Sequence, residues 1–369
     1  MGARTRGLAN NVLSSGKLDA TDAISGTIAA GNIANDSLTS ATTFGSVSGG
    51  VPQVAGDPPA PAEGDIWYNT STGTLRFRSV LQAWSSGGNL NNTRLGQGGA
   101  GRTDNTASIV FGGGTFGPQA GLSPTESYDG TTWTEVNDLN TARYYTGESG
   151  TTTSALCISG RNPALGTPTQ YVTNVESWNG TSWTEITDVN SLRSKAGGDG
   201  VDNTSALFVA GNGGDPDPTS TKVESWNGST WTEVNDVNTG REGPDASGIQ
   251  TSMIAFGGND GTSNVAINES WNGTSWTEVA DMNTVKNASQ GVGADNTSAL
   301  AYGGSGGVTA TESWNGSAWT EVGNMATGRN DFGASGSTSS AIAAGGAPPP
   351  LGINTTEEWT QGDTTFTVG

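Results

Sequence analysis

The sequence predicts an all-β protein built from six copies of one four-stranded unit. Two observations support this. A Glu-x-aromatic tripeptide recurs at spacings of 43–50 residues, and the remainder of each unit repeats in step with it. Short runs separated by turn residues fill every unit, and no segment has a helical period. The tripeptide begins at Glu126, Glu176, Glu224, Glu269, Glu312 and Glu357.

A hairpin is expected directly after each tripeptide. Asn-Gly between two strand-like runs is typical of a two-residue type I′ turn, which needs positive φ at both central residues. It stands at Asn179-Gly180, Asn227-Gly228, Asn272-Gly273 and Asn315-Gly316. The second strand of each hairpin is expected to carry an aromatic residue, at Trp133, Trp183, Trp231, Trp276, Trp319 and Phe366.

A basic residue ends the next segment of each unit, which reads Asp-x-Asn-Thr-x-Arg in its clearest copies. A glycine stands seven residues after every one of these bases, as in Arg94 and Gly101, so this position is expected to need positive φ or to have no room for a Cβ. Because one base and one glutamate occur in each unit, they are expected to form repeated ion pairs rather than a catalytic site. The bases are Arg94, Arg143, Arg193, Arg241, Lys286 and Arg329.

Four short strands in a repeat of 40 to 50 residues are typical of a β-propeller blade. We therefore expect six blades over residues 89–369. A further hairpin over residues 63–88 is expected to form a neck or to close the ring. It could instead be half of a seventh blade, but the chain lacks the inner strand pair that such a blade requires, since it stops just after Phe366. The repeated tryptophans are expected to pack between blades.

The composition excludes several classes of function. The chain has 369 residues and no histidine, so it cannot form an imidazole metal site or a Ser-His-Asp triad. A net charge of −20 disfavours binding to nucleic acid or to an anionic membrane. We expect no cofactor, no metal site, no catalytic residue and no membrane insertion.

The repeat resembles the kelch family. Kelch blades carry a double glycine after the second strand, then a Glu-x-aromatic strand and a tryptophan on the fourth strand. These features stand here as Gly257-Gly258, Glu269-x-Trp271 and Trp276, although the span between the two aromatic residues is shorter than in that family. The resemblance covers roughly residues 89–369 and implies a kelch-like propeller.

Residues 1–62 are rich in Ser, Ala, Asn and Gly and contain no Trp or Tyr. The run from Leu18 to Leu38, followed by Asp65-Ile66-Trp67-Tyr68-Asn69, resembles the N-terminal parts of tail-fibre-like virion proteins of marine bacteriophages. The resemblance implies a structural protein of the phage particle. Residues 1–62 would attach it to other virion proteins or form a homo-oligomer such as a trimer.

The propeller would then display loops for recognition of a host-surface glycan or protein. A capsid decoration or tail-collar protein without receptor binding is the first alternative, and a glycan depolymerase is the second.

The segments between the second and third strands of each unit differ most and are expected to share one face, where a ligand would bind. Aromatic residues outside the repeat register are better candidates for sugar stacking than the repeated tryptophans; they are Phe116, Tyr144, Tyr145, Tyr171 and Phe332. Of these, Phe116 and Tyr171 enter the candidate ligand-binding set. Polar loop residues complete the candidate ligand-binding set; Asp and Asn oxygens there could also bind Ca²⁺, although solvated turns are the simpler interpretation. These polar residues are Asn212, Asp215, Asp217, Asn259 and Asp260.

Overall fold

The computed structural model describes residues 51–59, 61, 64–115, 120–166, 170–348 and 352–368. The predicted attachment segment over residues 1–62 lies almost wholly outside them, as does Phe116. The chain divides into two compact units. The large unit is Ala83–Thr360, and the small unit combines Met1–Gln82 with Gln361–Gly369.

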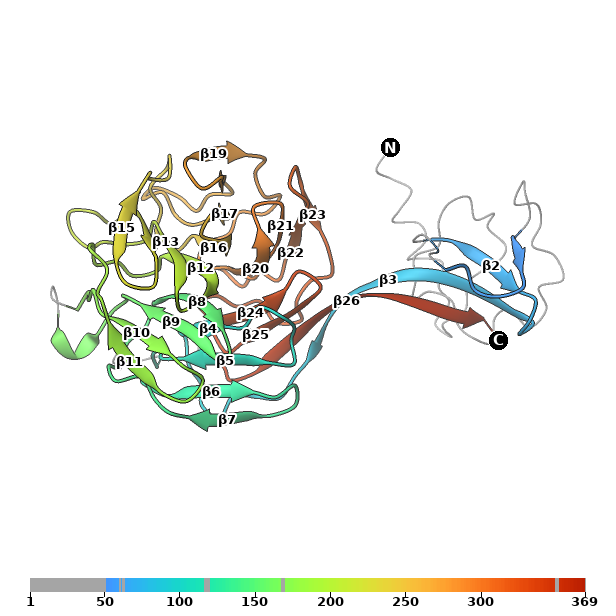
Figure 1. Cartoon of the computed structure of the whole chain (residues 1–369), viewed down its shortest axis with the longest axis horizontal. Helices are drawn as coiled ribbons and strands as arrows, with labels where there is room; N and C mark the ends of the chain where they lie inside the picture. Colours follow the sequence, from blue (N-terminus) through green and yellow to red (C-terminus); the bar gives the residue numbers. More distant parts are fainter. Residues whose placement is uncertain are drawn as a thin grey trace. The chain divides into compact units, whose positions relative to one another are not determined.

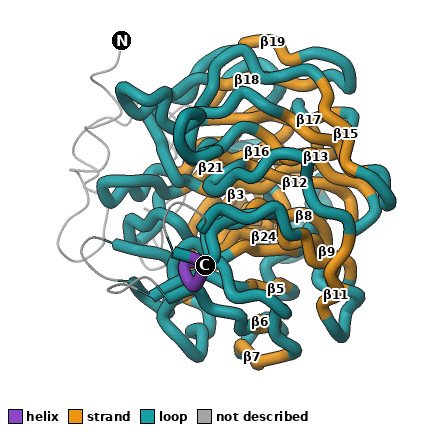
Figure 2. The backbone as a smooth tube through the Cα atoms, turned by 90° about the vertical axis from the view of Figure 1, so that its left-hand side faces the viewer, coloured by secondary structure: helices purple, strands orange, loops and turns teal. Residues whose placement is uncertain are grey.

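Six sheets follow one another along the large unit, and the prediction of an all-β fold is confirmed (Figure 1). The first five each have four strands in sequence order. Figure 2 shows strands joined by loops, and the one helical turn in the described part of the chain is η1 (Pro163–Leu165).

The strands of the first three sheets are β4 (Gly98–Ala100), β5 (Ser108–Phe111), β6 (Thr125–Tyr128), β7 (Trp133–Val136); β8 (Gly147–Thr151), β9 (Ser154–Ile158), β10 (Val175–Trp178), β11 (Trp183–Ile186); and β12 (Gly197–Asp202), β13 (Ser205–Val209), β14 (Val223–Trp226), β15 (Trp231–Val234). The fourth and fifth sheets comprise β16 (Asp245–Ile249), β17 (Ser252–Phe256), β18 (Asn268–Trp271), β19 (Trp276–Val279); and β20 (Gln290–Asp295), β21 (Ser298–Tyr302), β22 (Thr311–Trp314), β23 (Trp319–Glu321).

The sixth sheet takes its strands from both ends of the described chain. Its order is β1 (Gln53–Val54), β2 (Ile66–Asn69), β3 (Thr74–Ser86), β26 (Thr356–Val368), β25 (Ser340–Ala344) and β24 (Gly333–Ser337). Within the large unit, residues 83–86 of β3 lie beside residues 356–360 of β26. Trp84 packs against Trp359, with ring centroids 5.7 Å apart.

The expected hairpin between Trp359 and Phe366 is wrong, because β26 runs through both residues as one strand. Thr360 follows Trp359 directly, at the position where the other turns have Asn or Asp. In those turns the side-chain Oδ1 accepts two backbone hydrogen bonds, as Asn179 does from the amides of Thr181 and Ser182. The outer strand that Phe366 was expected to begin is supplied by residues 83–86 of β3.

The other hairpins form as predicted, but their turn type differs from the prediction. Trp178 pairs directly with Trp183, so the loop has four residues rather than two. Only Gly180 has positive φ within it, whereas a type I′ turn would require the same of Asn179. The Asn-Gly pair therefore acts through an asparagine cap followed by a left-handed glycine.

The hydrophobic core is divided into clusters that lie between neighbouring sheets. One cluster joins Phe111 of the first sheet to Trp178 and Trp183 of the second. The first and last sheets meet in the same way, where Trp133 packs with Ile342. This confirms the prediction that the repeated tryptophans pack between units.

The first strands of the sheets contact one another in succession, and β24 contacts β4. This arrangement is consistent with a β-propeller. The glycine seven residues after each base lies on or beside these inner strands, where an added Cβ would lie 2.0–2.8 Å from a carbonyl oxygen of the next strand. Four of the six also have positive φ, so both expected reasons for glycine apply. These glycines are Gly101, Gly150, Gly200, Gly248, Gly293 and Gly336.

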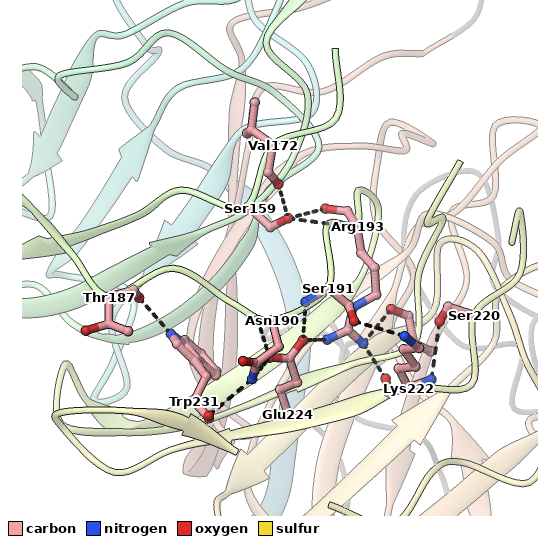
Figure 3. Close-up of polar contacts among 11 residues, drawn as sticks. Ser159, Val172, Thr187, Asn190, Ser191, Arg193, Ser220, Lys222, Glu224 and Trp231 are labelled. Carbon is pink, nitrogen blue, oxygen red and sulfur yellow. Dashed lines mark hydrogen bonds and ion pairs between the residues drawn. The ribbon is translucent and has the colours of Figure 1, made fainter. Parts of the chain in front are cut away.

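A buried ion pair holds the segment that leads into each inner strand (Figure 3). In the third sheet, Arg193 Nη2 lies 2.9 Å from Glu224 Oε1. Glu224 Oε2 also accepts hydrogen bonds from the amide and side chain of Asn190 at 2.7 and 2.8 Å. One carboxylate therefore fixes three groups of the same crossover segment.

All six predicted base–glutamate pairs are formed, each within its own sheet. Every one of the twelve residues is at most 4% exposed. Burial lowers the pKa of Arg193 to about 10, even though Glu224 favours the charged form, so the guanidinium remains charged at neutral pH. The pairs are Arg94–Glu126, Arg143–Glu176, Arg193–Glu224, Arg241–Glu269, Lys286–Glu312 and Arg329–Glu357.

Replacing one partner of such a pair should be costly, because it leaves a buried charge without compensation. We expect Glu224→Gln to lower the free energy of unfolding by about 3 kcal/mol or more. Glu233→Gln, on the exposed part of neighbouring β15, should change it by less than about 0.5 kcal/mol. Urea denaturation of both variants checks this, and equal losses would contradict it.

Candidate functional site

A closed ring of six backbone hydrogen bonds marks one mouth of the space enclosed by the inner strands. Each residue in the ring stands two positions after a repeat base, donates its amide to the preceding member and accepts from the next. The N···O distances are 2.6–3.1 Å, and the cycle closes between Gly96 N and Asp331 O. Its members are Gly96, Tyr145, Lys195, Gly243, Ala288 and Asp331.

All six residues of this mouth ring have left-handed backbone conformations, with φ between 48° and 66°. Glycine adopts that conformation freely, and two positions carry it, Gly96 and Gly243. A residue with a side chain costs on the order of 1 kcal/mol or more there. Three positions nevertheless hold large or charged side chains, Tyr145, Lys195 and Asp331, which identifies the mouth as a candidate functional site.

A hollow of about 30 Å³ lies at this mouth, and Tyr145, Lys195 and Asp331 are all part of its lining. A space of that size accommodates one or two water-sized groups. Burial raises the pKa of Asp331, and the positive charge of Lys195 partly offsets the effect. Burial also raises the pKa of Tyr145, and the charge of Asp331 adds to it.

Arg161 joins the mouth to the loops farther from the centre. Its Nη2 donates to Tyr171 Oη at 2.6 Å and its Nε donates to Ser194 Oγ at 3.2 Å. The guanidinium carbon lies 4.6 Å from the ring centroid of Tyr171 and 5.8 Å from that of Tyr145. Two half-buried tyrosines and one arginine thus form a continuous aromatic and cationic surface.

Glu242 is the acidic counterpart of this surface. Its carboxylate lies 3.1 Å from Lys195 Nζ and accepts a hydrogen bond from Asn212 Nδ2. Burial alone would raise the pKa of Glu242, but Lys195, Asn212 and Arg161 together outweigh it and hold the pKa below its usual value. Glu242 is therefore ionised at neutral pH and fixes the position of the lysine.

The structure brings together some of the predicted ligand-binding residues and separates others. We call the side chains of Tyr145, Arg161, Lys195, Glu242 and Asp331 the mouth cluster. Tyr171 and Asn212 also belong to it, since Tyr171 contacts Arg161 and Asn212 contacts Glu242. Asp215 is exposed in the loop that follows Asn212, and Asp217 accepts a backbone hydrogen bond from Gly213.

The second predicted pair of polar residues forms a closed turn. Asp260 Oδ1 accepts from the amides of Thr262 and Ser263 and from the Thr262 hydroxyl, and these hydrogen bonds lower the pKa of Asp260. Asn259 donates its side-chain amide to Asn264. These oxygens serve the turn itself, which agrees with the solvated-turn interpretation.

Four residues of the mouth cluster were not selected from the sequence: Arg161, Lys195, Glu242 and Asp331. A signal for two of them was available. When the repeats are aligned, Lys195 and Asp331 fall on the position held by Gly96 and Gly243, where positive φ could be expected. Arg161 and Glu242 have no such signal, because their partners come from distant segments.

Comparison with known proteins gives no match to any protein-family model or to any curated protein. No helix in the described residues is long and apolar enough to cross a membrane. The same residues contain no group of three or more acidic, cysteine or histidine side chains suited to holding a metal ion.

Relieving the strain at the mouth should stabilise the protein. Asp331→Gly removes a side chain from a left-handed position and a carboxylate that is costly to ionise there, so we expect a gain of about 1 kcal/mol in the free energy of unfolding. Thermal and urea denaturation at pH 7 measure the effect. A decrease of similar size in the free energy of unfolding would show that the Asp331 side chain stabilises the fold.

Proposed function

We propose that this protein is a tail-fibre-like structural protein of a bacteriophage particle, and that its large unit is a six-bladed kelch-like β-propeller that binds a host-surface glycan at the mouth. The blade count is supported by six sheets and by one mouth-ring residue from each repeat. The virion role is supported by the resemblance of the N-terminal run. In this proposal, residues 1–62 attach the protein to other virion proteins or to further copies of the chain.

One observation carries the recognition role. The mouth accepts the conformational cost of displaying Tyr145 and Lys195 at positions where other repeats use glycine. A side chain kept at such a cost without repeating around the ring is better explained by a ligand than by the fold.

The chemistry of the cluster favours a carbohydrate. The half-buried ring of Tyr171 can pack against the apolar face of a sugar ring. Arg161 and Lys195 can donate hydrogen bonds to hydroxyl or carboxylate oxygens, and Glu242 can accept from hydroxyls. The hollow of about 30 Å³ would take a single substituent while the sugar ring lies across the mouth. Several copies in one particle would raise the strength of a weak individual contact.

A direct test measures binding of the full-length protein to a panel of bacterial surface polysaccharides. We expect Tyr171→Ala and Lys195→Gly each to weaken binding by about tenfold, the equivalent of about 1.4 kcal/mol. Glu278→Gln, exposed on β19 and far along the fourth sheet from the mouth, serves as the control and should bind as the unchanged protein does.

Three results would contradict the proposal. The first is the absence of binding to any polysaccharide or host cell, which the decoration or collar alternative predicts. The second is release of reducing sugar from a polysaccharide, which the depolymerase alternative predicts. Binding that all three variants retain at full strength would place the recognition site away from the mouth.

A further inference from the structure

The inner strands enclose a second cavity, of about 30 Å³, that is separate from the hollow at the mouth and lined by all six sheets. We call it the channel cavity. Most of its lining consists of Gly, Ala and Ser, as crowding around a common centre requires. Three carboxylates interrupt this pattern: Glu148 on β8, Asp199 on β12 and Asp245 on β16.

These carboxylates do not belong to the repeat. They occupy three different register positions on three consecutive inner strands. At the position of Glu148 the other repeats have Gly or Ala, and at the position of Asp245 they have Gly or Gln. Ring formation therefore does not require an acid at either place, and their presence calls for a separate explanation.

Within the described part of the chain, Asp199 alone of the three carboxylates has a cationic partner. Arg102 Nη1 pairs with Asp199 Oδ1, and the same arginine donates to the carbonyls of Gly200 and Gly293 at 3.1 Å. Asp199 Oδ2 accepts the amide of Gly248 at 2.9 Å. This acid is thus compensated by one full charge and by backbone dipoles.

Asp245 is compensated much less. Its Oδ1 accepts the amide of the next residue, Ala246, at 2.8 Å. Its Oδ2 is buried and has no hydrogen-bond partner, and the residue is only 4% exposed. Among the described residues, neither Asp245 nor Glu148 forms an ion pair. Two acids and one ion pair therefore share a cavity that admits about two water molecules.

We propose that Asp245 and Glu148 form a proton-binding site in the channel cavity, which keeps the two acids neutral near pH 7 and makes the stability of the ring fall as the pH rises. An ionised carboxylate without a partner is expensive to bury, whereas a neutral acid can donate its proton to a neighbouring oxygen. This proton-binding site does not require a ligand at the mouth.

The net electrostatic effect of the groups around Asp245 agrees with this. Burial raises the pKa of Asp245 to about 8; the amides of Ala246 and Gly291 oppose the rise, and Asp199 adds to it. Burial likewise raises the pKa of Glu148 well above its usual value, with further contributions from Asp245 and Asp199. Tyr302 on β21 is a further titratable group near Asp245, and its pKa is also raised by burial.

The direction of the pH effect follows from proton linkage. The unfolded chain releases the proton of Asp245 near pH 4, whereas the folded chain retains it until about pH 8. Between these values the folded state binds more protons, so stability decreases as the pH rises. Above about pH 8 both states have released the proton, so Asp245 causes no further change in stability.

The test compares the unfolding temperature of the full-length protein with that of Asp245→Asn between pH 5.5 and pH 8.5. Asparagine keeps the shape of the side chain and cannot ionise. We expect the unchanged protein to lose about 5 °C or more over this range and the variant to lose less than half as much. Glu233→Gln, which removes an exposed acid, should follow the unchanged protein.

A second measurement does not depend on the stability of a variant. Infrared difference spectra of the unchanged protein between pH 6 and pH 9 should show the carbonyl stretch of a buried neutral carboxylic acid disappearing as the pH rises. Equal pH dependence in Asp245→Asn and the unchanged protein would overturn the proposal, and so would absence of the infrared signal. Stability that depends on added Na⁺ or Ca²⁺ rather than on pH would also overturn it, because the acids would then be ionised around a cation.

Discussion

The buried glutamate of each repeat is the interaction on which the remainder of the large unit depends. It neutralises a fully buried base and holds the amides of the crossover that delivers the chain to the next inner strand, as Glu224 does for Asn190 and Arg193. A charge pair at such depth contributes little net stability by itself, but its geometry is exacting. The buried pair fixes the backbone, because only one path of the crossover satisfies all the hydrogen bonds of the glutamate. Repeated six times, that constraint places the residues of the mouth ring within hydrogen-bond distance of one another.

The joint between the first and last sheets uses the same contacts as the other joints. Trp133 Nε1 donates to Thr356 Oγ1 at 3.1 Å, just as Trp183 Nε1 donates to Thr125 Oγ1 between the first two sheets. Asn105 donates to the carbonyl of Trp359, repeating a contact made by equivalent residues at other joints. The outer strand of the sixth sheet comes from the other end of the described chain, so the sheet that begins and ends the ring is completed by residues far apart in sequence.

The features that recur in every repeat could be predicted from the sequence, whereas most features that occur once could not. Six-fold recurrence revealed the sheets, the ion pairs and the crowded glycines, because each was visible several times. It misplaced the last outer strand, because Phe366 is the aromatic residue that follows Trp359 in the chain, at seven residues rather than the five of the other repeats, whereas Trp84 has the sheet position. Of the mouth cluster, the sequence predicted Tyr171 and Asn212 as ligand-binding residues. It did not predict Arg161, because contacts such as that of Arg161 with Ser194 depend on tertiary structure. The channel acids escaped notice because an acid flanked by Gly and Ser, such as Glu148, resembles a surface residue until the inner strands enclose it.

Closure of six repeats into one cooperative ring is the central claim, and native-state hydrogen exchange tests it most directly. The amides of the mouth ring should all exchange with the same free energy of opening, equal to that of global unfolding. The decisive amides are those of Gly96, which donates to Asp331, and Gly336, which donates to Gly101, because both bridge the first and last repeats. Protection of these two equal to that of Lys195 is the predicted result. Exchange at Gly96 and Gly336 that is much faster than at Lys195 would show that the first and last repeats do not close a ring.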